Sequence, residues 1–300
     1  MTLIELIEAS AAQLEAAGLS FENGFGQGTT NAFDEAAWLV MWQLKLPLDD
    51  LDSVENRPVS EAERAQAAML LGARIATRQP AAYLTHEAWL MGVPFYVDER
   101  VIIPRSLIAE LLVDESIDPW LGEDTRRVLD LCTGNGSLAV IAAMSYSEVV
   151  VDAADISADA LAVARINLDR HALAARITLI ESDGLAACPG SYDLILCNPP
   201  YVNAASMAAL PPEFKAEPAL ALAGNMHGGS DGMDFIRVLF QNAASQMNEN
   251  AVLVLEIGNE KSNFERAFPE LEPLWFETSA GNEQVMLLTR EQLTRYLKPR

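Results

Sequence analysis

The sequence has few basic residues. Lys and Arg number 20 against 43 Asp and Glu, which gives the 300-residue chain a formal net charge of −23. A surface this acidic repels phosphate backbones, so it argues against DNA as a partner and favours a basic protein. The alternative is that the acidic residues only keep the protein soluble.

Cysteine and histidine are also rare. The three cysteines, Cys132, Cys188 and Cys197, cannot all pair, and their spacing is not that of metal ligands. We therefore expect them to be small apolar core residues, and we expect no metal site. The three histidines are scattered along the chain and suggest no catalytic triad.

Long hydrophobic runs are missing. No stretch of about 18 apolar residues occurs, and the segment that begins at Met1 is acidic rather than basic. These absences predict a cytoplasmic protein with neither a membrane span nor a signal peptide. They leave the oligomeric state open.

The N-terminal part has the pattern of helices. Half of all residues are hydrophobic, and a chain of this length is expected to form two domains. Apolar residues recur at helical spacing over 33–44, and Ser60 with Glu63 forms a capping-box pattern that starts a helix toward Arg78. We expect residues 1–85 to form a small helical domain that recognises the substrate.

A β-hairpin is predicted next. Strand-like segments at 87–91 and 95–97 flank Gly92-Val93-Pro94, which has the composition of a turn. We interpret residues 86–104 as a hairpin linker between the two domains.

The C-terminal part, residues 105–300, alternates strands with helices. Such alternation predicts an α/β fold with a mainly parallel, doubly wound sheet. A long segment over 203–232 is rich in Ala, Gly and Pro, and we interpret it as a flap that covers the substrate. The expected strands are 128–132, 149–155, 177–180, 193–197, 251–257, 274–278 and 284–289, of which the last two form a closing antiparallel pair.

The most informative motif is Asn198-Pro199-Pro200-Tyr201, which follows the apolar run 194–197. A buried strand that ends this way delivers an amide side chain and stiffened carbonyls to the carboxyl edge of the sheet, where ligands of open α/β sheets bind. Fixed acceptors there could hold the N–H groups of a planar nitrogen and aim its lone pair at an electrophile. The alternative is that the prolines only mark the end of a strand.

A glycine turn lies upstream, in the run 128–136. Gly134 and Gly136 let the backbone bend tightly and approach a ligand, and the helix after them offers unpaired N–H groups. Asp130, four residues before the turn, would repel a pyrophosphate but suits an ammonium group. The pattern therefore favours S-adenosylmethionine over a nicotinamide cofactor.

Two further acids follow predicted strands. Asp155 comes nineteen residues after Gly136, where a carboxylate can accept both hydroxyls of a ribose. Asp183 follows the next strand and could accept from an adenine amino group. Either acid alone could instead be a solvated loop residue or a helix cap.

Together these motifs resemble the Rossmann-like, S-adenosylmethionine-dependent methyltransferases that modify a glutamine side-chain amide in translation proteins. The likeness extends from about Gly28 to Thr289. It implies a seven-stranded methyltransferase domain with S-adenosylmethionine as cofactor. The residues that the resemblance assigns to the cofactor are Asp130, Thr133, Gly134, Gly136, Asp155, Asp183 and Asn198.

The sequence is more similar to the branch that acts on protein three of the large ribosomal subunit than to the release-factor branch. The segments 28–36 and 95–106 carry this likeness, whereas the release-factor branch has a Pro-x-Thr-Glu run after its Pro-Arg pair. Leu107 and Gln27 depart from the ribosomal branch, in which a proline and a histidine are expected. A basic ribosomal protein is therefore the expected partner.

The resemblance also implies a mechanism. Asn198 and the carbonyl of Pro199 would accept the two amide hydrogens, while Tyr201 would pack over the amide plane; an ordinary core aromatic is the alternative for Tyr201. Catalysis is assigned to Asn198, Pro199 and Tyr201, and substrate binding to these three with Pro200, Arg105 and Glu217. For Arg105 and Glu217 a structural ion pair or turn is an equal alternative.

Three other functions stay open. The same chemistry on a release factor is one, and methylation of an adenine amino group in nucleic acid is another. The third is a cofactor-binding ribosome-assembly factor whose catalysis is dispensable.

Overall fold

The computed structural model describes residues 1–21 and 23–297, which form two compact units. The first unit comprises Met1–Ala88, Val97–Glu99 and Leu210–Glu217. The second comprises Trp89–Tyr96, Arg100–Ala209 and Pro218–Arg300. Within the described ranges, no helix is long and apolar enough to cross a membrane.

Helices build the first unit, as the apolar periodicity predicts. Its helices are α1 (Leu3–Ala16), α2 (Ala32–Gln43), α3 (Leu51–Val54), α4 (Glu61–Thr77), α5 (Ala81–Thr85) and α10 (Pro212–Lys215). The predicted capping box is present, because Ser60 and Glu63 each accept a hydrogen bond from the other's backbone. Buried side chains such as Leu3, Leu39 and Leu71 pack the core.

The hairpin is present, but its turn is shorter than predicted. Strand β1 (Ala88–Leu90) pairs with β2 (Val93–Phe95), so the second strand begins two residues earlier than the sequence suggested. Met91 and Gly92 both have positive φ, 50° and 75°, and close a two-residue turn that matches the twist of the flanking strands. Val93 and Pro94 therefore belong to the strand.

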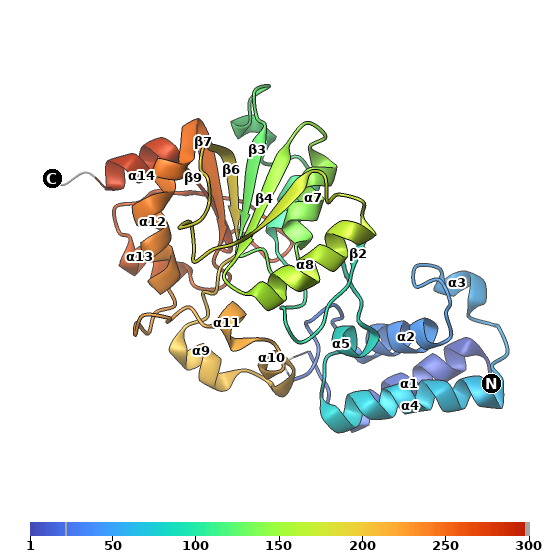
Figure 1. Ribbon diagram of the computed structural model, residues 1–300. Helices are drawn as coiled ribbons and strands as arrows, with labels where there is room; N and C mark the ends of the chain where they lie inside the picture. Colours follow the sequence, from blue (N-terminus) through green and yellow to red (C-terminus); the bar gives the residue numbers. More distant parts are fainter. Residues whose placement is uncertain (22, 298–300) are drawn as a thin grey trace. The chain divides into compact units, whose positions relative to one another are not determined.

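The second unit contains the expected α/β sheet. Within the described residues its order is β5-β4-β3-β6-β7-β9-β8, in which β3 to β7 are parallel and β9 runs antiparallel to both β7 and β8 (Figure 1). The strands are β3 (Arg127–Leu131), β4 (Val150–Asp155), β5 (Ile177–Glu181), β6 (Tyr192–Cys197), β7 (Met247–Glu256), β8 (Leu274–Trp275) and β9 (Val285–Thr289). This confirms the predicted fold class, including the closing antiparallel pair.

Helices cover both faces of this sheet (Figure 1). On one face α6 (Ile108–Val113), α7 (Ser137–Ser145) and α8 (Ala158–Arg170) pack over inward side chains of the strands. On the other face lie α12 (Asp234–Gln246), α13 (Lys261–Ala267) and α14 (Arg290–Tyr296). The chain order reverses between β3 and β6, so their carboxyl ends form the switch point at which ligands of such sheets bind.

The segment 203–232 is more ordered than a loop. It contains α9 (Ala204–Ala209), α10 and α11 (Ala219–Leu222), and its middle part belongs to the first unit. Glu213 on α10 is fully buried and forms ion pairs with Arg74 and Arg78. The first seven residues of the predicted flap, 203–209, are thus followed by a stretch that belongs to the helical unit, which the sequence pattern does not indicate.

Candidate active site

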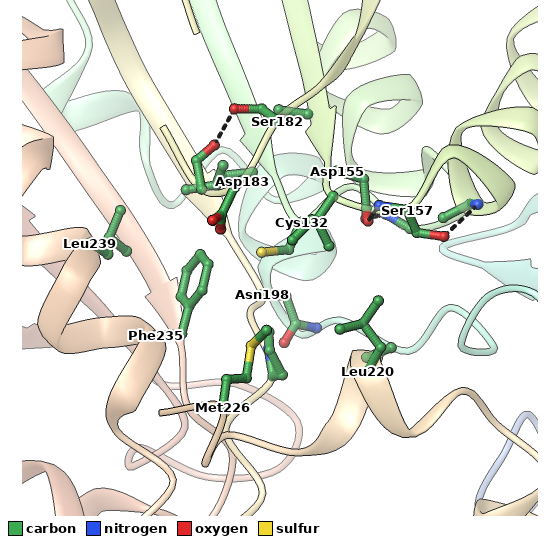
Figure 2. Close-up of a pocket in the computed structure, with 18 of the residues that line it drawn as sticks. Cys132, Asp155, Ser157, Ser182, Asp183, Asn198, Leu220, Met226, Phe235 and Leu239 are labelled. Carbon is green, nitrogen blue, oxygen red and sulfur yellow. Dashed lines mark hydrogen bonds between the residues drawn. The ribbon is translucent and has the colours of Figure 1, made fainter. Parts of the chain in front are cut away.

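A pocket opens at the carboxyl ends of β3, β4 and β6, within the second unit (Figure 2). Its empty volume is about 1080 Å³ when the open mouth is counted. This volume is large enough for a small molecule, whose binding pockets have volumes of at least about 300 Å³. Its polar lining includes Asp155, Asp183 and Asn198, while much of the remaining wall is apolar. The apolar wall includes Leu131, Ile156, Leu185, Leu220, Met226, Phe235, Val238 and Leu239.

The glycine turn forms part of this lining. Gly134 has φ +54°, and no atom lies within 4 Å of the place where a Cβ would stand, so its backbone faces open space. Gly136 has φ +82° and directly precedes α7, where a Cβ would lie 3.2 Å from the Cβ of Ala164. Both glycines are therefore required for conformation, and Gly136 also for the close approach of α8.

Asp130 lies behind the turn and not in the pocket lining. It is fully buried, and its Oδ2 accepts hydrogen bonds from the Thr133 hydroxyl and from the Ala139 amide at 3.0 Å. Its Oδ1 has no hydrogen-bond partner among the described residues. Burial raises the pKa of this carboxyl to about 7.

Asp155 ends β4 and lines the pocket beside the glycine turn. Its Oδ2 accepts from the Gly134 amide and its Oδ1 from the Ser157 amide, each at 2.9 Å. Burial raises its pKa. Each carboxylate oxygen can accept a second hydrogen bond, so the side chain can hold the turn and still receive ligand hydroxyls. Asp183 also lines the pocket and is exposed.

The Asn198 motif forms the middle of the site. In Figure 2 the Asn198 side chain lies between Cys132 and Asp155 on one side and Met226 on the other. This side chain is half-buried, and it makes no hydrogen bond to another described residue. Its amide is therefore free to bind a ligand at the edge of the pocket.

The rest of the motif supports Asn198. Pro200 lines the pocket, whereas Pro199 is buried and Tyr201 half-buried, and neither is part of the lining. The ring of Tyr201 packs on the backbone of Gly258, where an added Cβ would stand only 2.7 Å from Cε2. Burial, followed by the charge of the nearby Glu256 carboxylate, raises the pKa of the Tyr201 hydroxyl.

The two residues predicted near the substrate channel are not brought into the lining. Arg105 is half-buried, and its Nη1 donates to the carbonyl of Ile103 at 3.1 Å. Glu217 is buried within the first unit. Among the described residues, no group of three or more His, Cys, Asp or Glu side chains could hold a metal ion.

Cys132 meets the prediction of a core residue only in part, because it packs against the core and also lines the pocket. It follows β3 with φ 64°, is half-buried and lines the pocket, because the left-handed backbone turns its side chain out of the sheet. A hydrogen bond with Cys197 and burial raise the pKa of its thiol, so we expect a neutral and weakly reactive group. Cys188 and Cys197 are buried as predicted.

Sequence reasoning did not find the aromatic and thioether part of the wall. In Figure 2 Phe235, on α12, lies below Asp183, and Met226, on the segment before α12, lies below Asn198. Apolar residues on an amphipathic helix have the pattern of ordinary core residues, and only the fold shows that these face a cavity.

Comparisons with known proteins agree with this geometry. Residues 108–225 match the family described as "Methyltransferase small domain". The "Ribosomal protein uL3 glutamine methyltransferase" of Bordetella pertussis is 48% identical over 97% of this chain and 96% of its own. The proteins of the same name from Burkholderia pseudomallei and Neisseria gonorrhoeae are each 45% identical over 97% of this chain and 95% of theirs.

One solved structure is informative about the fold. The human Mettl16 catalytic domain, in complex with an RNA hairpin, superposes with a TM-score of 0.51 over 77% of this chain and 81% of its own. At 14% identity this similarity shows a shared methyltransferase fold and nothing about the substrate.

Proposed function

Because the chain belongs to the family of the ribosomal protein uL3 glutamine methyltransferases, we propose that it methylates the side-chain amide nitrogen of a glutamine in uL3, with S-adenosylmethionine as the methyl donor. The observation that carries the proposal is the free Asn198 amide at the edge of a pocket lined by Asp155 and the Gly134 turn. This combination joins a nucleoside site with a site for a planar amide.

The residues of the pocket fit the cofactor. Asp155 is a ribose acceptor at a strand end, and the open face of Gly134 allows a ligand to approach the backbone. The buried Oδ1 of Asp130, which has no partner among the described residues, offers an acceptor behind the turn. Asp183 and the apolar wall suit an adenine ring and its amino group. When bound, S-adenosylmethionine supplies a methyl group on a positively charged sulfur, which is a strong electrophile.

The chain's own task is to orient the acceptor. An amide nitrogen is a poor nucleophile because its lone pair is delocalised into the carbonyl. The side-chain oxygen of Asn198 and the main-chain carbonyl of Pro199 would accept its two hydrogens and leave the lone pair pointing at the methyl group. The proton is lost after the new bond forms, when the nitrogen has become acidic, so the site needs no strong base.

We further propose that the acidic surface attracts this acceptor. The net charge of −23 favours encounter with a basic protein and disfavours a nucleic acid, because charges of one sign steer the opposite sign. The N-terminal helical unit would then recognise the surroundings of the target glutamine. Since the acceptor is a ribosomal protein, we place the reaction in the cytoplasm.

The test uses purified uL3 from a strain that lacks this protein. Incubation with labelled S-adenosylmethionine should label uL3 at one glutamine, identified by mass spectrometry of its peptides. A release factor that lacks its own methyl group serves as the competing acceptor in a parallel reaction. If the release factor is labelled in preference to uL3, the proposed substrate is wrong and the chain acts on a release factor.

A further inference from the structure

The end of the target motif is held by a segment that the sequence does not connect with it. Strand β7 lies beside β6, and Leu255 pairs with Cys197, so the residues after each strand emerge side by side. We call Glu256, Gly258 and Glu260 the 256–260 clamp. Its members contact Tyr201 and Asn203, which follow Asn198.

Glu256 is the centre of this clamp. It is 4% exposed, and its Oε2 accepts from the Ser106 hydroxyl at 2.6 Å and from the Leu107 amide at 3.0 Å. Burial and the negative charge of this carboxylate raise the pKa of the Tyr201 hydroxyl, so the two groups lie close together. The Arg105–Leu107 segment and the target motif are far apart in the sequence. One buried side chain therefore contacts both of them.

Gly258 and Glu260 complete the contact. The ring of Tyr201 occupies the space that a side chain at position 258 would need, since a Cβ there would stand 3.0 Å from Cζ and from the hydroxyl oxygen. Two residues further, the Glu260 Oε1 accepts from the Asn203 side-chain amide at 2.6 Å. Tyr201 is thus held through its ring and through the chain that follows it, and its hydroxyl lies near the Glu256 carboxylate.

The chemistry of Glu256 is costly for a residue with only a packing role. Burying a carboxylate is unfavourable unless hydrogen bonds and a positive charge compensate it. Burial raises the pKa of Glu256 to about 7, although its hydrogen bonds and the nearby Arg105 guanidinium favour the charged form. Despite this free-energy cost, a buried carboxylate offers several hydrogen-bond acceptor positions in a fixed geometry, which an apolar side chain does not.

We propose that Glu256 is a positioning residue for the methyl acceptor, which sets the orientation of Tyr201 and of the Arg105–Leu107 segment and takes no part in cofactor binding. The inference rests on the proposed function, because the acceptor is the glutamine amide. It is supported by the position of Glu256 outside the pocket lining and by its hydrogen bonds to Ser106 and Leu107, which directly follow Arg105, a predicted substrate-binding residue.

The test compares Glu256→Gln and Glu256→Ala with the parent protein. Glu256→Gln keeps the shape and one oxygen acceptor, so it should lose less activity than Glu256→Ala. Displacing a substrate-positioning group by a fraction of an ångström costs about tenfold to a hundredfold, and we expect kcat with uL3 to fall in this range for Glu256→Ala. The Kd for S-adenosylmethionine, measured by calorimetry, should stay within about twofold. An unchanged kcat, or a cofactor Kd that rises in parallel with the loss of kcat, would overturn the proposal.

A matched control separates positioning from stability. Asp193, near the start of β6, also accepts from two backbone amides, those of Arg126 and Arg127, at 2.8 and 2.9 Å. Asp193→Asn should lower the melting temperature and leave kcat unchanged. Combining Glu256→Gln with Tyr201→Phe should cost less than the sum of the two single changes, because both alter the same interaction between the carboxylate and the Tyr201 hydroxyl. Additive losses would contradict a role through Tyr201.

A readout without acceptor keeps this inference separate from the proposed function. Hydrogen exchange in the 198–203 segment should become faster in Glu256→Ala, whereas the 130–139 segment should be unaffected. If the parent protein fails to methylate uL3 while exchange follows this pattern, the proposed substrate is wrong and the clamp is real. Equal exchange in the 198–203 segment would overturn the clamp whatever the acceptor.

Discussion

Replacing Asp130 by Asn should stabilise the ligand-free protein at alkaline pH. Asp130 is fully buried behind the glycine turn, and its Oδ1 has no hydrogen-bond partner among the described residues. The nearby Asp155 carboxylate also disfavours a second negative charge. The ionised form of Asp130 is therefore strained in the native state, and a neutral amide of the same shape removes that strain.

The magnitude follows from the two pKa values. Burial raises the pKa to about 7 in the native protein, compared with 3.8 for an ordinary aspartate. Between these values the native state binds more protons than the unfolded state, so stability is highest at the acid end and is lost as the pH rises. The slope is about 1.4 kcal/mol for each pH unit and falls to half of that at the native pKa, so the wild type should lose about 2.3 kcal/mol from this group between about pH 5 and pH 7. The stability of Asp130→Asn should not fall in this way, because an amide does not ionise.

Urea unfolding of both proteins at about pH 5 and pH 8 measures the effect as a change in the free energy of unfolding. The stability difference between variant and wild type should shift by about 2–3 kcal/mol in favour of the variant at the higher pH. Comparison at two pH values cancels the cost of the unpaired amide group, as well as the contribution of Glu256, which is present in both proteins. Parallel pH dependences would refute the view that Asp130 is held ionised at a cost.

The remaining predictions concern the site and the surface. Asp155→Ala should weaken binding of S-adenosylmethionine by about 1.5–3 kcal/mol, the scale of hydrogen bonds to a charged group, and calorimetry that shows an unchanged affinity would remove Asp155 from the site. Asn198→Ala should lower turnover by about a hundredfold or more while the cofactor Kd stays nearly constant, and turnover within a few-fold of the parent would leave the motif as a structural turn. The association rate with uL3 should fall steeply above about 0.15 M salt, where the screening length is about 8 Å, and stopped-flow rates independent of salt would make the acidic surface a solubility feature only.

Much of the fold could be predicted from local patterns. Apolar runs alternate with helical periodicity after residue 127, and the carboxyl ends of parallel strands must meet at one edge of the sheet. For this reason Asp155, Asp183 and Asn198, each recognised at the end of a separate strand, indeed line one pocket. Their proximity follows from topology and needs no knowledge of side-chain contacts.

Other features depend on long-range contacts that no local pattern contains. The stretch 210–217 joins the helical unit through the buried ion pairs of Glu213, which connect positions more than 130 residues apart. Glu256 has the sequence pattern of an acid at the end of a strand, and only the pairing of β7 with β6 places it under Tyr201. Cys132 packs against the core as expected, but its φ of 64°, which is a property of the turn and not of the residue type, also brings it to the pocket.

The charges around the pocket suggest how binding and rate enhancement are divided. In the proposed site, carboxylates such as Asp155 and Asp183 would stabilise a positively charged donor before reaction. During methyl transfer the positive charge moves from the donor to the acceptor nitrogen, so these acids favour the ground state at least as much as the transition state and cannot by themselves raise turnover. The acceleration must then come from groups that hold the amide in its reacting orientation. Asn198 and the buried contacts that fix the chain after it are the parts of this structure suited to that task.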